Sequence, residues 1–541
     1  MNINSMSKLI LWLFPALFFF QSCSDKVPEM DVSRIASSNG SLVNEGYNRC
    51  IRYVNDWMNY ADTITGLIPR NINESRNYWN AWDAAADNYP FMVLTSSLTM
   101  PEFFRTHAAE MLHTEERLTS RIGKLPDTYS FSEKGFRNDI ADTSQIIFGS
   151  AEYMKDGLIP LTEWLGESPW SKRMLGILDD LTSLTRVVKE LPGSFYGGSA
   201  VAEVNGDLLQ VLSRMYWFTG KREYLEWAAE IADHYLNETN LPTNLNGKLR
   251  IRDHGCEIIS GLCEAYLAAS YSWPEKREEW KPYIHSMLDR ILEKGRNSDG
   301  LFYNEINPVT GEIISDGVAD TFGYTLNAYY FVYQLDSVAA YREAVLKGLG
   351  ALNNNYVSYD WERGSADGYA DAIEGALNLY NREQMTSVKD WIDSQIKVMW
   401  DMQKPSGIIE GWHGDGNFAR TTIMYCLWKS QGLTAENWHQ DLKIGAECKD
   451  GVLYASISCE PGWSGKIKFD IPRWRDKMHM PADYPRINQF QQWFTVEAGK
   501  SYDVTFYPSG KRKNYSGQQL IDGLTLKIKQ QDEVFLTVKE Q

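Results

Sequence analysis

Apolar residues recur every three or four positions along most of the chain, from about residue 43 to residue 432. This spacing predicts amphipathic helices, and it is clearest in "RCIRYVNDWMNYAD", "GDLLQVLSRMYWFTGKREYLEWAAEIADHYL" and "YREAVLKGLGALNNNY". Loops that are rich in glycine or contain proline separate the helical stretches. Each unit is therefore a long loop, an apolar helix, a short turn and a more polar helix, and the unit repeats along the chain.

A ring of such hairpins is an (α/α) toroid, in which inner helices form a barrel and outer helices wrap it. The pattern predicts a mainly α protein with an (α/α)6-type toroid of six to seven hairpins over residues 43–436. About seven pairs are present, whereas six is the common closed number. Either one pair lies outside the ring, or the expected boundaries are displaced.

After about residue 438 the apolar period changes from three or four to two. "GVLYASISC", "GKIKFDIP" and "EVFLTVKE" alternate apolar and polar residues, and turn signals such as "KDG" and "PSG" separate such runs. This pattern predicts a small C-terminal antiparallel β-sandwich over residues 437–541. We expect it to pack against the toroid and stiffen it rather than bind sugar.

The first residues form a targeting segment. The apolar run "LILWLFPALFFF" follows Lys8, and it has the length of a signal-peptide core rather than a membrane span. "QSCSDK" comes next and resembles a bacterial lipoprotein signal, in which a lipidated Cys23 becomes the first mature residue. We expect a signal peptide over residues 1–22, a tether over 23–42, and a lipid anchor in the bacterial outer membrane, facing the periplasm or the cell surface. The alternative is a plain secretory signal.

Charge and cysteine content narrow the class of protein. The 71 acidic and 54 basic residues give a formal charge of −17, which argues against a nucleic-acid partner. Neither a Cys-x-x-Cys motif nor a cysteine/histidine cluster occurs in the sequence. We therefore expect neither a metal centre nor a cofactor. Aromatic residues make up 13% of the chain, and they suit either helix packing or sugar stacking.

Acidic residues repeatedly stand four positions apart. Five such pairs stand at the expected starts of inner helices: Asp83 with Asp87, Glu203 with Asp207, Asp253 with Glu257, Asp316 with Asp320, and Asp367 with Asp371. Residues four apart lie on one face of a helix. A single pair is readily explained as acids that favour a helix N-terminus. Five pairs at one rim of a toroid would instead line its mouth with carboxylates, and cleavage of a glycosidic bond needs two carboxyl groups.

One helix start gathers several polar groups. "RDHGCEIISGLCEAY" places His254 and Glu257 three positions apart, directly after Arg252 and Asp253. A lone histidine is usually a structural residue. Four polar groups so close together before an apolar helix indicate a functional site instead.

Two further stretches suit a sugar-binding loop. "GIIEGWHGDGNFARTT" is a glycine-rich loop that enters a helix, where Trp412 is suited to stack on a sugar and Arg420 to bind a carboxylate. "GLIPRNINESRNYWNAWDAAADNYPF" is either a sugar-binding loop or a packed aromatic loop. The candidate substrate-binding residues of the three stretches are Arg70, Asn80, Trp82, Tyr89, Arg252, Asp253, Glu410, Trp412, Asp415 and Arg420.

With a toroid first and a β-sandwich last, the mature chain resembles the six-hairpin glycosidase superfamily. "PRNINESRNYWNAWDAAADNYPF", "RDHGCEIISGL" and "GWHGDGNFART" look most like the Bacteroidetes β-glucuronidase lipoproteins, of the glycoside hydrolase family 154 type. The resemblance implies an exo-acting hydrolase with arginine side chains that grip a uronate. The C-terminal strands also look like those of β-L-arabinofuranosidases, but the metal-bound cysteine cluster of those enzymes is missing from the sequence.

We therefore expect an extracytoplasmic glycoside hydrolase that removes uronic acid, glucuronic acid in particular, from acidic oligosaccharides or polysaccharides. The expected catalytic residues are Glu257, Asp320 and Asp371, with His254 and His413 as proton partners or substrate hydrogen-bonders and with Asp87 and Glu203 in reserve. Two alternatives stay open, a polysaccharide lyase on the same fold and a non-catalytic glycan-binding lipoprotein. The "HGCE" spacing is also similar to the His-x-x-Glu of sugar epimerases, which are typically cytoplasmic.

Overall fold

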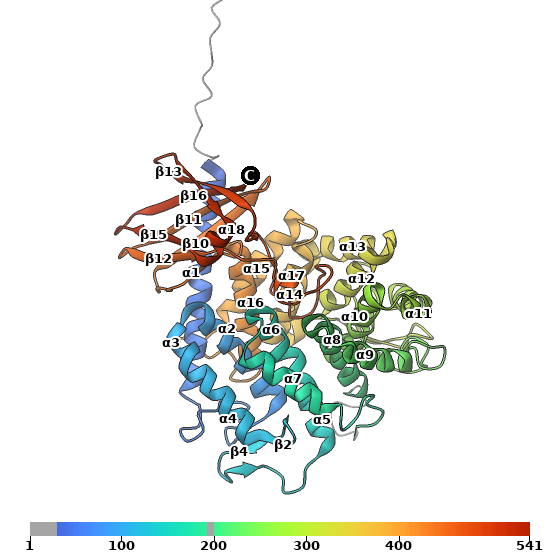
Figure 1. Cartoon of the computed structure of the whole chain (residues 1–541). Helices are drawn as coiled ribbons and strands as arrows, with labels where there is room; N and C mark the ends of the chain where they lie inside the picture. Colours follow the sequence, from blue (N-terminus) through green and yellow to red (C-terminus); the bar gives the residue numbers. More distant parts are fainter. Residues whose placement is uncertain (1–29, 192–199) are drawn as a thin grey trace, which may run out of the picture.

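A computed structural model describes residues 30–191 and 200–541. The expected signal peptide, Cys23 and the first residues of the expected tether lie outside the described residues. Among the helices described, none is both long and apolar enough to cross a bilayer. The chain forms a helical ring with a β-sandwich on one end, as Figure 1 shows.

Seven inner helical segments form the barrel. They are η1–α2 (Ala81–Asn88, Tyr89–Thr99), α5–η3–α6 (Thr143–Glu152, Tyr153–Leu158, Ile159–Leu165), α8 (Ala200–Thr219), α10 (Glu257–Ser272), α12 (Phe322–Asp336), α14 (Ala366–Tyr380) and α16 (Gly414–Lys429). Each packs against the next, and α16 packs against η1 and α2. The described residues therefore close a ring of seven hairpins.

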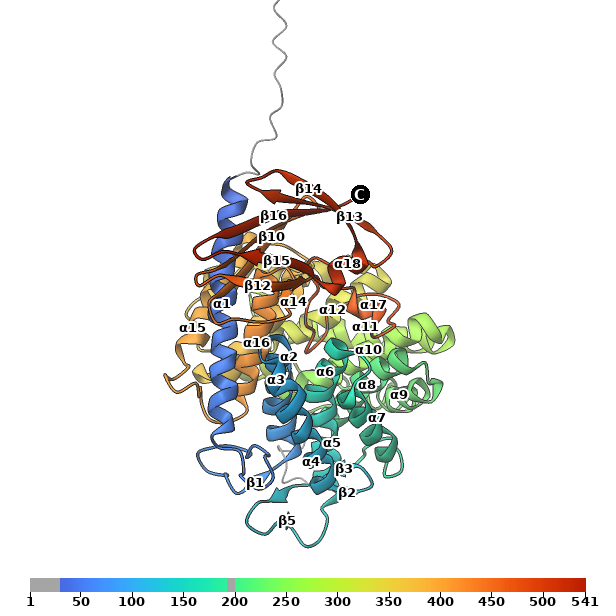
Figure 2. The ribbon, with the colours of Figure 1, turned by 60° about the vertical axis from the view of Figure 1, so that its left-hand side comes forward.

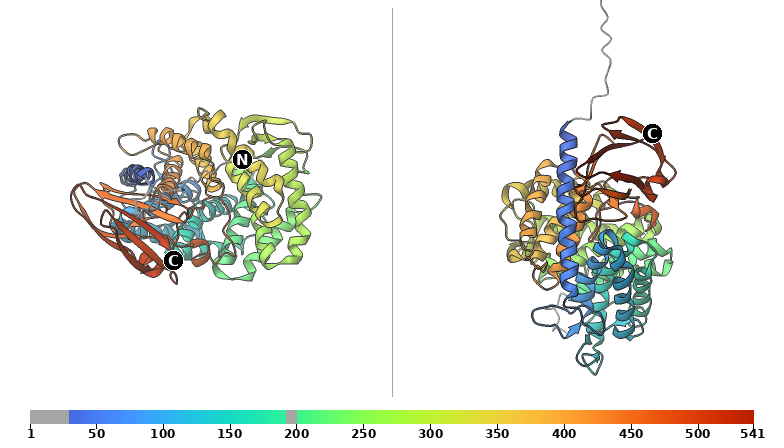
Figure 3. Two further views of the ribbon diagram at one scale, coloured as in Figure 1. Left: turned by 90° about the horizontal axis from the view of Figure 1, so that it is seen from above. Right: turned by 90° about the vertical axis from the view of Figure 1, so that its left-hand side faces the viewer.

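Seven outer helices wrap this barrel: α1 (Met30–Met58), α4 (Ala109–Thr119), α7 (Pro169–Leu181), α9 (Arg222–Tyr235), α11 (Pro274–Lys294), α13 (Ala339–Asn355) and α15 (Thr386–Asp401). Their large aromatic side chains, such as Trp57, Trp227 and Trp280, are buried between the two layers. The view from above in Figure 3 shows the helices arranged around the ring. The expected toroid is confirmed, and helix packing accounts for much of the tryptophan content.

Short elements connect the hairpins. They are β1 (Tyr78–Trp79), α3 (Pro101–Phe103), η2 (Phe104–Ala108), β2 (Ser120–Ile122), β3 (Leu125–Pro126), β4 (Tyr129–Ser130), β5 (Gly135–Phe136), β6 (Leu249–Arg250), η5 (Asp253–Cys256), β7 (Tyr303–Ile306), β8 (Ile313–Val318) and η6 (Trp361–Gly364). Several of them directly precede an inner helix, as β1 precedes η1, η5 precedes α10 and η6 precedes α14. The elements that precede an inner helix therefore lie at the end of the ring where inner helices begin, whereas α3 and η2 join α2 to α4.

Glycines set how closely the inner helices approach each other. A Cβ on Gly206 of α8 would lie 2.3 Å from the carbonyl carbon of Glu257, and a Cβ on Gly323 of α12 would lie 2.3 Å from the Cα of Gly375 in α14. Only glycine permits such backbone contact. These contacts draw the starts of neighbouring inner helices together, and with them the acidic side chains near those starts.

Two antiparallel sheets form the C-terminal domain, as expected. The larger has the order β10-β11-β16-β13-β14, and the smaller has the order β15-β12-β9. The strands are β9 (Thr434–Ala435), β10 (Leu442–Lys449), β11 (Val452–Cys459), β12 (Trp463–Lys468), β13 (Ser501–Tyr507), β14 (Lys511–Ser516), β15 (Leu524–Ile528) and β16 (Glu533–Glu540), with the short helices α17 (Arg473–Asp476) and α18 (Gly517–Asp522) between them. Because β9 pairs with β12, the sandwich begins slightly before residue 437.

Helix α1 corrects the expected tether. It begins at Met30 and runs along the sandwich and then the toroid, so residues 30–42 are packed helix and not a polar linker (Figure 2). Ala36 is fully buried, and the Asn39 side chain donates to the Ala446 carbonyl oxygen at 2.9 Å. The apolar spacing of α1 already begins at Val32 and Ala36, but small and polar residues between them obscure it in the sequence.

The chain between the two sheets returns to the toroid. Arg486 forms a buried ion pair with Glu163 of α6, with Nη2 2.8 Å from Oε2. The Asn488 side chain donates to Asp156 Oδ1, also at 2.8 Å. The sandwich domain therefore packs against the ring, as expected, and the chain between its two sheets places Ile487 and Asn488 inside the ring.

Candidate active site

An acidic cavity of about 250 Å³ opens among the inner helices. Its lining includes nine carboxylic side chains: Asp83, Asp87, Glu152, Asp156, Asp253, Glu257, Glu362, Asp367 and Asp371. Four basic side chains share it: Lys155, His254, His413 and Arg420. Packing so many carboxyl groups in a partly dry space separates their pKa values. The cavity is therefore suited to acid/base chemistry.

The acidic pairs lead to this cavity, with two exceptions. The pairs that begin at Asp83, Asp253 and Asp367 place both members in the lining. Glu203 and Asp207 of α8 are buried behind it. The remaining pair was wrongly assigned to a helix: Asp316 is exposed on strand β8 and Asp320 is buried before α12, outside the lining. The apolar residues Ile313, Ile314 and Val318 around Asp316 favour the strand.

Asp83 is the best-anchored carboxylate of the cavity. Its oxygens accept hydrogen bonds from Arg70 Nε at 2.7 Å, Asn80 Nδ2 at 2.5 Å and Trp412 Nε1 at 3.0 Å. Burial alone would raise the pKa of Asp83, but His413 and Arg70 lower it below its usual range. Asp83 therefore stays charged to lower pH than an ordinary aspartate, and it holds the loops around it.

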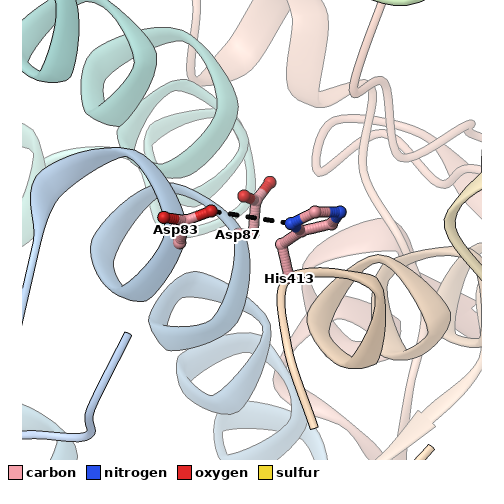
Figure 4. Close-up of side chains that lie close together, drawn as sticks. All are labelled: Asp83, Asp87 and His413. Carbon is pink, nitrogen blue, oxygen red and sulfur yellow. Dashed lines mark ion pairs between the residues drawn. The ribbon is translucent and has the colours of Figure 1, made fainter. Parts of the chain in front are cut away.

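Asp87 lies one turn further along η1 in a contrasting setting. Its closest hydrogen-bond donor is Asn417 Nδ2, at 3.5 Å. Burial and the charges of Asp156, Asp367 and Asp83 raise the pKa of Asp87 well above its usual range, although His413 opposes the rise. Asp87 therefore holds its proton to higher pH than Asp83 does. Figure 4 shows Asp83, Asp87 and His413 side by side.

Asp371 of α14 is fixed by two donors. Arg420 Nη2 lies 2.5 Å from its carboxylate, and the Tyr324 hydroxyl donates to it at 2.8 Å. Burial raises the pKa of Asp371 to about 6, against the opposing charge of Arg420. Asp371 is therefore mostly ionised at neutral pH and oriented, as a base or nucleophile must be.

His413 is a cation between two carboxylates. Its Nδ1 lies 3.5 Å from Asp83 Oδ1, and its Nε2 lies 3.7 Å from Asp367 Oδ2. Burial opposes its charge, but the hydrogen bond to Asp83 and the charges of Asp367 and Asp87 raise the pKa of His413 to about 10. The side chain of His413 is 34% exposed, so this charge is available to a ligand.

Glu257 and His254 form another wall of the cavity. Glu257 accepts hydrogen bonds from Lys155 Nζ at 2.6 Å and from Gln210 Nε2 at 2.5 Å. His254 Nδ1 faces Glu203 Oε1 at 2.8 Å, and its Nε2 faces Asp253 Oδ1 at 3.2 Å. Of the seven expected catalytic residues, the cavity therefore brings together Asp87, His254, Glu257, Asp371 and His413.

Most of the expected substrate-binding residues shape the loops instead of facing the cavity. Only Trp82, Asp253 and Arg420 are in its lining. Arg70, Asn80 and Trp412 surround Asp83. Glu410 accepts a hydrogen bond from the Ala366 N–H, and Asp415 accepts hydrogen bonds from the N–H groups of residues 409–411. Tyr89 donates to the Ala108 carbonyl oxygen, and Arg252 lies outside the lining. Polar residues in glycine-rich loops satisfy backbone groups first.

Several lining residues were not among the candidates. Glu152, Lys155 and Asp156 lie on α5 and η3. Glu152 and Asp156 are four residues apart, so the acidic spacing itself would have found them. Tyr324, Glu362, Asn417 and Ile487 carry no such signal, because only the folded ring brings them to the cavity.

Known proteins offer only distant likenesses. No family model matches the sequence, and no curated protein matches it. Among solved structures, the α-1,6-mannanase of Salegentibacter sp. HEL1_6 is 10% identical, with a TM-score of 0.41 over 70% of this chain and 98% of its own. The cellobiose 2-epimerase from Bacillus thermoamylovorans is 13% identical, with a TM-score of 0.38 over 51% of this chain and 87% of its own.

An unsaturated glucuronyl hydrolase from Bacillus sp. GL1 is also 13% identical, with a TM-score of 0.35 over 53% of this chain and 86% of its own. Similarities this low do not assign a function to this chain, so the cavity is the basis for a functional proposal.

Proposed function

We propose that the protein is a glycoside hydrolase whose acid and base are Asp87 and Asp371. The supporting observation is that one cavity presents two carboxyl groups with opposite surroundings. Asp87 has only a weak donor at 3.5 Å, whereas Asp371 is held by a guanidinium and a phenol. Hydrolysis of a glycosidic bond needs such a division between a protonated and an ionised carboxyl group.

The proton transfers follow from these two states. Asp87 gives its proton to the glycosidic oxygen as the bond from that oxygen to the anomeric carbon breaks. Asp371 either takes a proton from an attacking water or bonds to the anomeric carbon until water replaces it. In both routes one water is consumed. When Asp371 acts as a base, it ends protonated and Asp87 ends ionised, and exchange with solvent protons restores their starting states. When Asp371 bonds to the anomeric carbon, the water that replaces it gives a proton to Asp87.

Aromatic side chains offer a surface for the sugar. Trp82 and Phe148 line the cavity, and their rings meet edge to face with centroids 6.2 Å apart. A sugar ring presents C–H groups that pack on such faces. Asp253, Glu362, Asp367 and Asn417 supply acceptors and donors for its hydroxyl groups.

The finer proposal is release of a uronic acid from an acidic glycan. Arg70 was expected in a sugar-binding loop and Arg420 was expected to bind a carboxylate, but they are paired with Asp83 and Asp371. His413, charged and partly exposed, is the side chain that supports uronate binding. Neutral and amino sugars are the competing substrates, since the lining carries more acidic than basic groups.

A lyase on the same fold is the second candidate. It would need a neutral histidine or a tyrosinate to remove a proton from the sugar. Carboxylates raise the pKa of His413 to about 10, and burial raises the pKa of Tyr324 well above its usual value. Both groups hold their protons at neutral pH, which favours hydrolysis over elimination.

We also propose that a lipid on Cys23 anchors the protein to the outer membrane. Helix α1 has 29 residues, about 43 Å at about 1.5 Å per residue. It begins beside the sandwich and runs down the toroid (Figure 3, right). Near its end, Trp57 Nε1 donates to Asp415 at 2.9 Å. The cavity would then face away from the membrane. Cys23→Ala should release the protein from the membrane fraction, and continued membrane association would contradict the anchor.

Activity on defined glycans tests the proposal. Oligosaccharides capped with a uronic acid, a neutral sugar or an amino sugar are incubated with the wild-type protein and with Asp371→Asn, and the products are weighed by mass spectrometry. Products that together equal substrate plus one water, formed by the wild type alone, would support hydrolysis. Equal product formation by both proteins would remove Asp371 from the mechanism.

A further inference from the structure

We infer that Glu152, Glu203 and His254 bind a divalent transition-metal ion beside the cavity. A carboxylate oxygen from each glutamate and a ring nitrogen of His254 all lie within 4.8 Å of one another. The residues come from three successive segments of the ring, α5, α8 and η5. Glu152 and His254 line the cavity, so the site would be open to it.

Unsatisfied oxygens point to a missing ligand. Glu203 is 1% exposed and Glu152 is 4% exposed. Within residues 30–191 and 200–541, Glu203 Oε2 and Glu152 Oε1 are buried and accept no hydrogen bond. Buried carboxylate oxygens are normally paired with donors or with a cation. A metal ion would satisfy both at once.

The lysine of the cavity lining is paired with other carboxylates. Lys155 Nζ is 2.6 Å from Glu257 and 2.8 Å from Asp156, so it serves other carboxylates. Asp207 adds one more buried acid beside Glu203, and its side chain is hydrogen-bonded to that of Glu152. The group therefore contains more carboxyl than basic side chains.

His254 is held as metal-binding histidines are. One ring nitrogen, Nε2, lies 3.2 Å from Asp253 Oδ1, and the other, Nδ1, faces Glu203. A carboxylate behind the far nitrogen orients the ring and makes the near nitrogen a better ligand. In the metal-free protein a proton on Nδ1 would take the place of the ion.

A second group of similar shape provides a contrast. Asp83, Asp87 and His413 also lie within 4.8 Å of one another. There the Asp83 oxygens already accept hydrogen bonds from Arg70, Asn80 and Trp412. The Arg70 guanidinium would repel a metal ion, so geometry alone does not make a site in this group.

The ligand types select the metal. Carboxylates suit hard ions, whereas imidazole suits first-row transition metals, so a mixed set favours Zn²⁺ or Mn²⁺ over Ca²⁺ or Mg²⁺. Three protein ligands leave coordination positions free. These positions would face the cavity through Glu152 and His254, where water or a sugar oxygen can enter.

Metal binding tests this inference without an activity assay. The full chain is stripped with a chelator, dialysed against Zn²⁺ or Mn²⁺ and analysed for bound metal, and its melting temperature is read with and without the ion. We expect one ion per chain, and a higher melting temperature in its presence. Binding of no ion by the wild type would overturn the inference.

Three variants locate the ion. Glu203→Gln and Glu152→Gln keep the side-chain shape, and each should weaken binding about 100-fold or more, whereas His413→Gln should keep the ion because it alters only the contrasting group. Undiminished binding by both glutamine variants, or loss only in His413→Gln, would contradict the assignment. If a variant does not fold, the wild-type stoichiometry and the remaining variant decide.

Discussion

The Arg420 guanidinium lies 2.5 Å from the Asp371 carboxylate and, through Nε, 2.8 Å from Glu374. Arg420 is 4% exposed, and its charge is paired with these two carboxylates inside the cavity wall. It therefore positions Asp371 instead of binding an anionic substrate. This relationship fixes the orientation of Asp371 in the cavity wall.

Replacing Asp371 with asparagine should remove activity and keep the fold. The amide cannot act as a base or nucleophile, and we expect kcat to fall by about 10³-fold or more. Asp316→Asn is the matched control, because Asp316 belongs to the same sequence pattern but is exposed on β8. Steady-state kinetics with circular dichroism as a fold check measures both. Similar losses in the two variants would contradict the assignment.

Activity should fall on the acid side near pH 6. The pKa of Asp371 is raised by burial to about 6, so protonation below this pH removes the base and kcat/KM should drop about tenfold per pH unit. Tyr324 donates to the ionised carboxylate and lowers its pKa. Tyr324→Phe should therefore move the acid limb to higher pH, and an unmoved limb would assign it to another group.

Asp87→Asn should show a dependence on the leaving group. A sugar leaving group needs the proton of Asp87, so its release should slow by about 10²- to 10⁴-fold. An aryl glycoside with an acidic phenol leaves without a proton and should lose much less. Rates for the two substrate types give the comparison, and equal losses would mean that Asp87 is not the acid.

The four-residue spacing of acidic residues predicted part of the site correctly and part of it wrongly. It led to Asp87, Glu257 and Asp371 because the pairs lie near the starts of inner helices, which the ring brings together. It failed at Asp316, where β-branched neighbours favour a strand over a helix. Spacing records which residues share a helix face, but not which segments are helical.

Contacts between segments that are far apart in the sequence could not be predicted from it. Arg70 and Arg420 looked free for a substrate, yet both are neutralised by carboxylates that only the fold places beside them. Ile487 reaches the cavity from the sandwich domain. The toroid and the sandwich were predictable, because apolar periodicity is a local property of the chain.

Helix contact in the ring should depend on Gly206. A Cβ there would lie 2.3 Å from the Glu257 backbone, so Gly206→Ala should destabilise the protein by about 3 kcal/mol through overpacking. Gly350 in the outer helix α13 meets only Met385 Cε, at 3.8 Å. Gly350→Ala should instead stabilise the protein by about 0.5–1 kcal/mol through helix propensity. Urea unfolding of both variants gives the two signs, and a stable Gly206→Ala protein would contradict the close contact.

Hydrolysis in water enriched with heavy oxygen tests the central claim most directly. An oligosaccharide that the protein cleaves is digested in this solvent, and the products are examined by mass spectrometry and ultraviolet absorbance. The account predicts one heavy oxygen at the newly formed reducing end and no absorbance from an unsaturated sugar. Products without the heavy oxygen and with rising absorbance would show elimination, and they would contradict the roles of Asp87 and Asp371.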